Sequence, residues 1–523
     1  MMKAMEYITG EHRTQNILFP DLLDNYVTQE NPTRVIDAYV DSLDLKNLGF
    51  ILSEAQTGRP PYNPTDLLKL YIYGYLNKIR SSRKLEQETK RNLELMWLLK
   101  KLTPDHKTIA RFRHDNPQAL KNTFKDFIRL CIKLDLYGKE LVAIDGSKFK
   151  ADNSKNRNIT KNKLVNRIAQ LDAKIDAINK EMDTCDQKEN VAEEKAEKTN
   201  NKKSTQETRA ILNQHLAELH RQKTAYQEHI KELEQTGESQ KSLTDPDSRL
   251  MKQANGNSDV CYNIQTAVDA KNKLVVDFEV TNAPNDFNQL SGMAKKALET
   301  LKVNRLSAVA DAGFDSATDI ANCLMQGVSV HIAGAKEFDV CVPCSKEEAV
   351  QTGELLSQIN GRCVYVAERN LVLCSMGRVL YPGCYSKTSK DASFYNSAAC
   401  KSCVCRCVKG KRRSFAMVMR EEKFSRVCDE SNLFVRQVRV RSDKNFVLLR
   451  KSLVEHPFGV LKRVMDMGYC LLRGFSRVRG EFSLAFLVYN LKRVINLVGV
   501  SKAHTSNTNT IEHRVTFFGF NVS

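Results

Sequence analysis

Residues 141–151 constrain the fold of this chain more than any other segment. They read LVAIDGSKFKA, in which an apolar run stops at Asp145 and Gly146 and is followed by small, basic and aromatic residues. A run of this length is typical of a buried strand and is too short for a helix. Two interpretations stay open from this segment alone. Asp145 either ends a strand, where many folds place a metal ligand or catalytic group, or forms a β-hairpin turn with Gly146.

A second segment repeats the pattern. Residues 306–311 are an apolar run that ends in Asp311, with Gly313 close behind. A helix over Ala317–Met325 and a strand over Val328–Ile332 are expected next. Together they make a βαβ unit, which favours a parallel pair of strands in a mixed sheet. Upstream, we expect strands at residues 260–268 and 274–280 joined by a short turn, and then a helix through residues 290–301.

The two aspartates lie far apart in sequence but would meet if their strands are neighbours. Adjacent carboxylates repel each other unless a divalent cation lies between them. A third carboxylate would complete an oxygen cage for two Mg²⁺ ions about 4 Å apart, the arrangement used for phosphoryl transfer. Glu455, expected near a helix start beside Pro457, lies in the most basic part of the chain. It is therefore either a metal ligand or an ion-pair partner.

The charge distribution indicates a polyanionic partner. The formal net charge is +18, and residues 401–500 contain 22 Lys and Arg against 8 Asp and Glu. A basic surface of that density binds nucleic acid through counterion release, although a merely soluble cationic face is the alternative. No apolar run approaches the ~18 residues of a membrane helix, and the first residues lack the apolar core of a signal peptide. We therefore expect a cytoplasmic protein with no membrane partner.

The N-terminal part predicts a compact helical domain after an irregular arm over residues 1–60. Helix starts are indicated by polar residues that can cap a helix, usually followed by proline. Gly138 is expected to end the last of these helices. Such domains include helix-turn-helix DNA readers, but helical packing without DNA contact is equally compatible with the pattern. The expected starts are Asn63-Pro64, Ser81-Ser82, Thr103-Pro104 and Asn116-Pro117.

Residues 161–240 have a heptad pattern. Apolar residues from Leu164 to Met182 follow a 4-3-4-3-4 spacing, and a second seam runs from Leu212 to Leu233. A charged linker separates the two seams. The pattern predicts two helices that fold back as an antiparallel coiled-coil hairpin, with no chemistry of its own.

Fifteen cysteines, an odd number, favour thiols or metal ligation over a disulfide framework. Cys400 and Cys403 form a Cys-x2-Cys chelate, with Cys374 and Cys407 available nearby to complete a tetrahedral Zn²⁺ site. Cys341 and Cys344 could supply the other half instead, and reduced thiols in a variable insertion are the alternative. A zinc site here would present the basic run Lys411, Arg412 and Arg413 to DNA.

Three motifs together resemble a known family. They are AIDGS around Asp145, ADAGF around Asp311 and VEHPFGVLK around Glu455. The set resembles the DDE transposases of bacterial insertion sequences, in particular the family numbered eleven-eighty-two, which is allied to family four. The resemblance runs from Pro61 to about Leu497. Further matching segments lie at residues 104–109, 245–249 and 262–269.

The resemblance implies an RNase H-like core in which Asp145, Asp311 and Glu455 bind two Mg²⁺ or Mn²⁺ ions. It implies cleavage of double-stranded DNA at the inverted repeats of the element and joining of the freed 3′-hydroxyl to target DNA. Synapsis of two ends implies a homodimer. The resemblance also places cysteines as in Cys374, Cys400, Cys403 and Cys407.

Related enzymes carry a Tyr-x2-Arg-x3-Glu-x6-Lys signature around the glutamate. Lys462 matches its lysine, whereas Leu448 and Lys451 stand at the tyrosine and arginine positions, with Arg450 adjacent. The tyrosine and arginine positions of the signature are therefore altered, whereas the carboxylate triad and the lysine match. Basic residues expected to contact DNA are Lys462, Arg450, Lys451, Arg463, Arg473, Arg477 and Arg479, in addition to the run from Lys411 to Arg413.

The expected fold class is α/β, with an RNase H-like mixed-sheet core interrupted by two insertions. Two other functions remain open: a DNA-binding protein that has lost catalysis, and a structural scaffold built on zinc and a coiled coil. The second would not require paired aspartates. The expected parts are an arm and helical DNA-binding domain (1–135), core segments (136–160, 241–340 and 430–500), a coiled-coil insertion (161–240), a Cys-rich insertion (341–429) and a flexible tail (501–523).

Overall fold

The computed structural model describes residues 22–52, 60–194, 200–253, 256–332, 338–344, 363–366, 369–374, 378–388, 391–403, 414–418, 434–440 and 444–499. The chain forms two compact units. The first contains the residues up to Asp135, Val464–Asp466 and the residues from Phe482 onward, and the second contains Leu136–Arg463 and Met467–Glu481. Among the described helices, none is long and apolar enough to cross a membrane.

The first unit is helical, as predicted. Buried aromatic side chains form much of its core, and the ring of Tyr39 packs edge-on against Phe127 with centroids 5.2 Å apart. Phe486 packs near Phe124 in the same core. The helices are α1 (Pro32–Asp41), α2 (Leu45–Leu48), α3 (Pro64–Leu76), α4 (Ser82–Thr89), α5 (Leu93–Leu98), α6 (His106–Asp115), α7 (Pro117–Lys133) and the part of α16 (Phe475–Val498) from Phe482 onward, after the short 3-10 helix η1 (Leu23–Tyr26).

Several predicted helix ends need correction. Asn63 does cap α3, because its side chain accepts a hydrogen bond from the Thr65 amide at 3.0 Å. The cap of α6 is Asp105 rather than Thr103, since a carboxylate there reaches the first free amides of the helix. Asn92 caps a separate helix, α5, so the single helix expected after Ser81-Ser82 is two. Gly138 ends no helix, because α7 already stops at Lys133.

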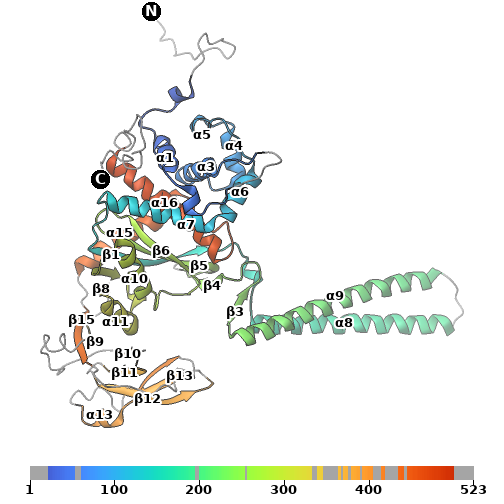
Figure 1. Cartoon of the computed structure of the whole chain (residues 1–523). Coiled ribbons are helices and arrows are strands. Elements are labelled where there is room, and N and C mark those ends of the chain that lie inside the picture. The colour runs from blue at the N-terminus through green and yellow to red at the C-terminus, as the bar shows by residue number, and fades with distance from the viewer. Residues whose placement is uncertain are drawn as a thin grey trace, which may run out of the picture. The chain divides into compact units, whose positions relative to one another are not determined.

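The second unit is built on a mixed sheet with the strand order β4-β5-β1-β7-β8, in which β6 also pairs with β5 (Figure 1). Strand β1 is antiparallel to β5 and parallel to β7, and β7 is parallel to β8. This mixed sheet is consistent with the expected RNase H-like core. The strands are β1 (Leu141–Lys150), β4 (Arg249–Lys252), β5 (Ser258–Asp269), β6 (Val275–Thr281), β7 (Leu306–Ala310) and β8 (Val328–Ile332).

Helices cover the sheet. Helix α15 (Lys444–Gly459) packs Leu453 and Val454 against Ala143 of β1 and Val309 of β7. Because side chains alternate along a strand, Asp145 lies on the same face of β1 as Ala143, toward α15. Helix α10 (Leu290–Leu301) packs against β5, β6, β1 and β7, and α11 (Ala317–Met325) connects β7 to β8 as the βαβ pattern predicted.

The heptad region forms two long helices, α8 (Lys161–Glu194) and α9 (Asn200–Thr236), which run side by side (Figure 1). Lys161 pairs with Glu234, and Lys223 with Asp172, so the helices are antiparallel. Leu164 and Leu233 are buried together where the pair begins. Strands β2 (Asn158–Thr160) and β3 (Gln240–Ser242) form an antiparallel pair. Strand β2 lies between the 3-10 helix η2 (Lys155–Arg157) and α8 in sequence, and β3 follows α9. That α8 and α9 form a coiled-coil insertion stays a prediction.

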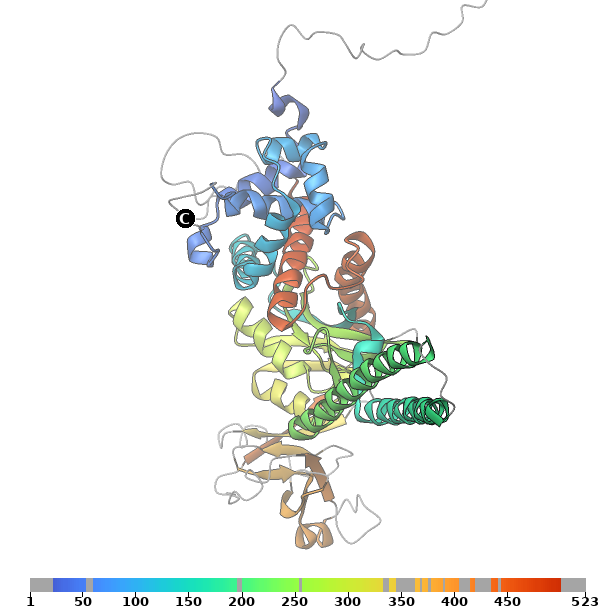
Figure 2. The same ribbon diagram turned by 90° about the vertical axis from the view of Figure 1, so that its right-hand side faces the viewer.

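The segment after β8 contains further small sheets, drawn in yellow to orange in Figure 2. One sheet has the order β10-β11-β12-β13-β14 and the other pairs β9 with β15. Apolar and basic residues alternate at the end of this segment, and they lie in β15, which ends at Val440. The elements are β9 (Phe338–Cys344), β10 (Val364–Val366), β11 (Leu371–Leu373), β12 (Val379–Ser386), β13 (Asp391–Tyr395), α13 (Ser397–Lys401), β14 (Ser414–Val418) and β15 (Phe434–Val440).

Candidate active site

The register of two parallel strands brings the two aspartates together. Ala143 of β1 pairs with Val309 of β7, so Asp145 and Asp311 each lie two residues further along and face the same way. Asp145 is not at a strand end, as the sequence suggested, because β1 continues to Lys150 as a partner of β5. It lies instead beyond the point where β7 stops at Ala310. The hairpin-turn interpretation of Asp145-Gly146 is therefore wrong.

Arg450 of α15 joins the two carboxylates. Its Nη2 atom donates to Asp145 Oδ1 at 2.9 Å and to Asp311 Oδ2 at 3.1 Å. The side chains of Arg450 and Asp145 are only 14% and 16% exposed, whereas Asp311 is 37% exposed. Burial raises the pKa of Asp145 to about 6; the Arg450 charge opposes this shift, and Asp311 adds to it. The guanidinium thus supplies the positive charge that this pair requires.

Arg450 contacts the acidic pair in this structure, and its predicted contact with DNA stays a prediction. It precedes Val454 by one helical turn, and Val454 is buried against the sheet. Arg450 therefore lies on the same face of α15 as Val454, at the C-terminal end of β7. Its Nε atom is buried and has no hydrogen-bond partner among the described residues. The guanidinium is held through one nitrogen only.

Glu455 occupies a different environment. It lies inside α15, four residues before the helix ends at Gly459, and not near a helix start. The reason is that Pro457 does not open the helix; it is tolerated in the last turn, and a π-helical turn, η4 (Val460–Val464), follows. Glu455 is exposed and forms no hydrogen bond or ion pair with the residues described. The structure does not group it with Asp145 and Asp311.

Lys462, the expected signature lysine, does lie near the aspartates. Its Nζ atom donates to Ser147 Oγ at 2.6 Å and lies 4.7 Å from the centre of the Phe149 ring, both on β1. Lys462 is exposed as a residue, but its ammonium group lies against β1. Desolvation there lowers its pKa, and the charges of Cys261 and Asp145 partly offset the shift. Lys462 therefore places a cation next to the aspartate strand.

The other basic residues expected to contact DNA fall into three groups. Arg473 pairs with Asp152 at 2.8 Å, and Arg479 pairs with Glu279, so both already have acidic partners. Three are exposed and have no ion pair within the described part of the chain: Lys451, Arg463 and Arg477. Lys411, Arg412 and Arg413 lie outside the described residues.

Three of the four expected zinc ligands, Cys374, Cys400 and Cys403, lie within the described residues. Cys374 is buried in the core of the five-stranded sheet beside Cys363, and Cys403 packs against that core. Cys400 is partly exposed on α13, and Cys407 lies outside the described residues. Within the ranges that the structure describes, no group of three or more His, Cys, Asp and Glu side chains is arranged to hold a metal ion. Zinc binding stays a prediction.

Asp286, in the loop between β6 and α10, was missed by the sequence analysis. Asn263 Nδ2 donates to its Oδ1 at 2.9 Å and Gln265 Nε2 donates to the same oxygen at 2.5 Å. Its charge adds to the rise in the pKa of Asp145. No strand-end pattern marks Asp286, so the only available signal was its position shortly after a strand that pairs with β5.

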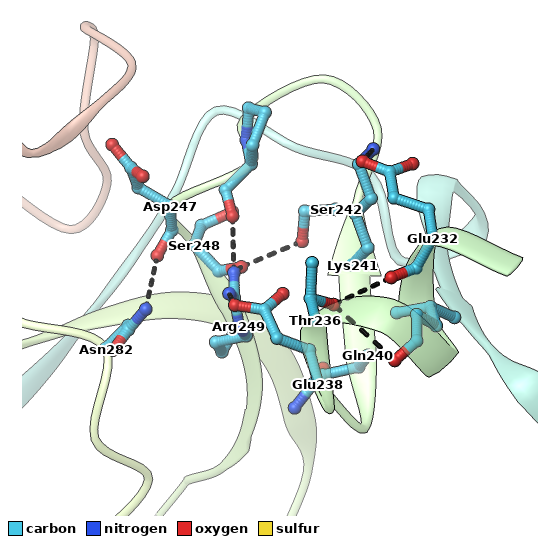
Figure 3. Close-up of polar contacts among 12 residues, drawn as sticks. Glu232, Thr236, Glu238, Gln240, Lys241, Ser242, Asp247, Ser248, Arg249 and Asn282 are labelled. Atoms are coloured by element: carbon cyan, nitrogen blue, oxygen red, sulfur yellow. Dashed lines mark hydrogen bonds and ion pairs between the residues drawn. The ribbon is translucent and has the colours of Figure 1, made fainter. Parts of the chain in front are cut away.

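The matching segment at 245–249 has a structural role. Asp245 is buried and accepts hydrogen bonds from the Tyr262 hydroxyl at 2.8 Å and from the Gly474 amide at 3.1 Å. Asp247 accepts from the Phe475 amide at 2.9 Å, at the start of α16. Figure 3 shows Asn282 bound to the Asp247 backbone, and Arg249 beside Glu238. These carboxylates fix the N-terminus of α16.

The paired aspartates fit a divalent cation in charge and in donor type. Both direct a carboxylate oxygen at one point, where a cationic nitrogen now lies. Oxygen donors are the ligands that Mg²⁺ and Mn²⁺ prefer. Asp145 and Asp311 could therefore hold such an ion if Arg450 gave way to it. The fit covers these two ligands and does not extend to Glu455.

Two family models match the chain. A transposase domain, DUF772, matches residues 21–115, and a transposase DDE domain matches residues 137–491. No curated protein matches the chain. The solved structure of a piggyBac transposase synaptic complex with hairpin DNA is similar over 91% of this chain and 81% of its own, at 10% identity and a TM-score of 0.28. A TM-score that low carries no inference, whereas the DDE match spans more than half of the chain.

Proposed function

Because this chain belongs to the family of transposases with a DDE domain, we propose that it cleaves DNA at the ends of a mobile element and joins the freed 3′-hydroxyl to target DNA. The observation that carries the proposal is the pair Asp145 and Asp311, aligned by strand register and bridged by Arg450. Burial of Asp145 next to the charge of Asp311 raises its pKa, which a purely structural sheet would avoid. Perturbed pairs of this kind are typical of functional sites.

In this mechanism Asp145 and Asp311 would hold a divalent cation, and the motif resemblance assigns Glu455 of α15 as a third acidic ligand, although the structure does not group it with the pair. When bound, two Mg²⁺ or Mn²⁺ ions activate water and neutralise charge on the phosphate that reacts. Lys462, held against β1, binds a phosphate oxygen of the DNA backbone. Arg450 keeps the two aspartates aligned and would give way to the cation. Its guanidinium would then be free to bind a DNA phosphate.

The finer assignments rest on the motifs. The residues around Asp145, Asp311 and Glu455 support an origin in a bacterial insertion sequence, of the family numbered eleven-eighty-two. The exposed cations Lys451, Arg463 and Arg477 support binding of double-stranded DNA. We further propose that the protein acts in the cytoplasm as a homodimer, because two element ends must be cut together.

A second candidate function is sequence-specific DNA binding without catalysis. The observation that favours it is Glu455, which is exposed and not grouped with the two aspartates. The two candidates differ in one measurable property. Only the active transposase would release a 3′-hydroxyl from DNA in the presence of a divalent cation.

The test is cleavage of DNA that carries the sequences flanking the gene, with Mg²⁺ and with EDTA. We expect cleavage by the wild type and its loss, by about a thousandfold or more, in Asp145→Asn and Asp311→Asn. Asp259→Asn is the matched control, because Asp259 lies on β5 and pairs with Lys155 rather than with the site. Cleavage that persists in Asp145→Asn would refute the proposal. Full activity in Glu455→Gln would refute only the role of Glu455.

A further inference from the structure

The carboxylate of Asp286 occupies the space that a side chain at position 146 would need. A Cβ atom added to Gly146 would lie 2.2 Å from Asp286 Oδ1 and 2.4 Å from Gln265 Nε2. A Cβ atom on Gly313 would lie 3.0 Å from Asp311 Oδ1 and 3.8 Å from Asp286 Oδ2. Asp286 therefore lies against the two glycines that follow the catalytic aspartates. The absence of a side chain at Gly146 is what admits it.

Two buried amides fix the orientation of Asp286. Asn263 is 1% exposed and Gln265 is fully buried, and both donate to Asp286 Oδ1. The oxygens of these amides, Asn263 Oδ1 and Gln265 Oε1, are buried without a hydrogen-bond partner in the described part of the chain. A buried hydrogen-bond acceptor without a partner lowers the stability of the fold. Side-chain amides that remain in this state therefore indicate a function beyond folding. The polar cluster is thus arranged around one oxygen of Asp286.

We propose that Asp286 is a positioning residue of the active site. It holds the backbone of β1 at Gly146, and its negative charge, next to Asp145 and Asp311, strengthens their hold on a divalent cation. Within the described part of the chain Asp286 forms no three-ligand metal group, so in this proposal it acts through the aspartates. The proposal rests on the proposed function, because it needs a cation at the aspartate pair. Groups that support metal ligands in this way change metal affinity by about 10–100-fold.

The test separates the charge of Asp286 from its hydrogen bonds. Asp286→Asn keeps an oxygen acceptor for the two amides but removes the charge, whereas Asp286→Ala removes both. Mn²⁺ binding to the full chain is measured by calorimetric titration, and the melting temperature is measured in EDTA. We expect Asp286→Asn to weaken Mn²⁺ binding about tenfold or more with little change in melting temperature. Asp286→Ala should weaken it as much and also lower the melting temperature by roughly 3–6 °C.

Controls distinguish the possible failures. Asp259→Asn, a carboxylate change on β5 away from the aspartate pair, should leave Mn²⁺ binding unchanged. If Asp145→Asn binds Mn²⁺ as tightly as the wild type does, the proposed function fails, because the aspartate pair is not the cation site. If Asp145→Asn abolishes binding but Asp286→Asn binds like the wild type, the proposed function stands and the role of Asp286 is overturned.

A double substitution tests the packing directly. Gly146→Ala should lower the melting temperature and Mn²⁺ affinity, because its methyl group displaces Asp286. Adding Asp286→Ala removes that clash and frees the end of Gln265 to move, so the double variant should melt at a higher temperature than Gly146→Ala alone. If the two losses simply add, Asp286 does not occupy the space at Gly146, and the inference fails.

Discussion

Replacing Arg450 with methionine tests whether the guanidinium holds the carboxylates of Asp145 and Asp311 together. The substitution keeps most of the side-chain length but removes donors that lie 2.9 Å from Asp145 and 3.1 Å from Asp311. Removing one partner of a buried ion pair costs about 3–5 kcal/mol. Asp311 is 37% exposed, so solvent screens part of the interaction, and we reduce the expectation to about 2–3 kcal/mol. For a unit of this size, that is a fall in melting temperature of roughly 5 °C.

The assay is thermal and urea unfolding in EDTA near neutral pH. Lys451→Met is the matched control, because Lys451 is the next residue, is exposed and has no ion pair in the described part of the chain. It should change stability by less than about 0.5 kcal/mol. The double variant Asp145→Asn with Arg450→Met should recover much of the loss, since one of the two uncompensated charges is gone. Mn²⁺ should stabilise Arg450→Met more than it stabilises the wild type, because no guanidinium must be displaced.

The reasoning is refuted if Arg450→Met is as stable as Lys451→Met. The ion pairs would then contribute no more than surface pairs, and the aspartates would need no counter-charge. It is also refuted if the double variant is less stable than Arg450→Met alone. In that case Asp145 would stabilise the sheet by contacts unrelated to its charge.

Three further substitutions test the surrounding structure. Burial alone would raise the pKa of Glu279, but Lys296 and Arg479 outweigh burial and lower the pKa. The ionised Glu279 therefore stabilises the fold at pH values above its pKa in the unfolded chain. This stabilisation is lost as the pH falls through the pKa of the folded state. Glu279→Gln should therefore lower the free energy of unfolding by about 1 kcal/mol at neutral pH. In a series of thermal melts at different pH, the difference in stability from the wild type should disappear below about pH 4.5. Tyr262→Phe takes a donor from buried Asp245 and should cost about 2 kcal/mol in urea unfolding; an unchanged midpoint would contradict this. Gly74→Ala would place a Cβ atom 2.5 Å from the Ile79 carbonyl oxygen, so it should cost about 1–3 kcal/mol despite better helix propensity, and a raised melting temperature would contradict it.

The fold was predictable where the hydrophobic pattern is strong and local. Helix α11 and strand β8 were predicted at the ends that the structure has, and β5 and β6 were predicted to within a few residues. The prediction of a helix start was wrong where two residues could cap the helix, as at Thr103 and Asp105. Which of them caps it depends on which side chain reaches the free amides. Local sequence does not contain that geometry.

The site was predictable in its residue types and not in its contacts. The motifs identified Asp145 and Asp311, but their alignment depends on a register between strands about 160 residues apart in sequence. The role of Arg450 could not be read from its neighbours, since it depends on which face of α15 packs on the sheet. Asp286 could not be predicted from the sequence, because its place in the site depends on the absence of a side chain at Gly146 on β1, far away in sequence.

The position of Asp145 within β1 explains why the site lies here. Strand β1 pairs with β5 through Lys150, but its pairing with β7 extends only to Ala143. Beyond that point one side of β1 is rigidly held while the other side has lost its strand partner. A carboxylate at Asp145 is therefore fixed by the antiparallel neighbour and open on the side where Asp311 and α15 approach. Had Asp145 ended its strand, as the sequence suggested, the backbone that orients it would lack the ladder to β5. The continuation of β1 thus supplies the rigidity that a catalytic carboxylate requires.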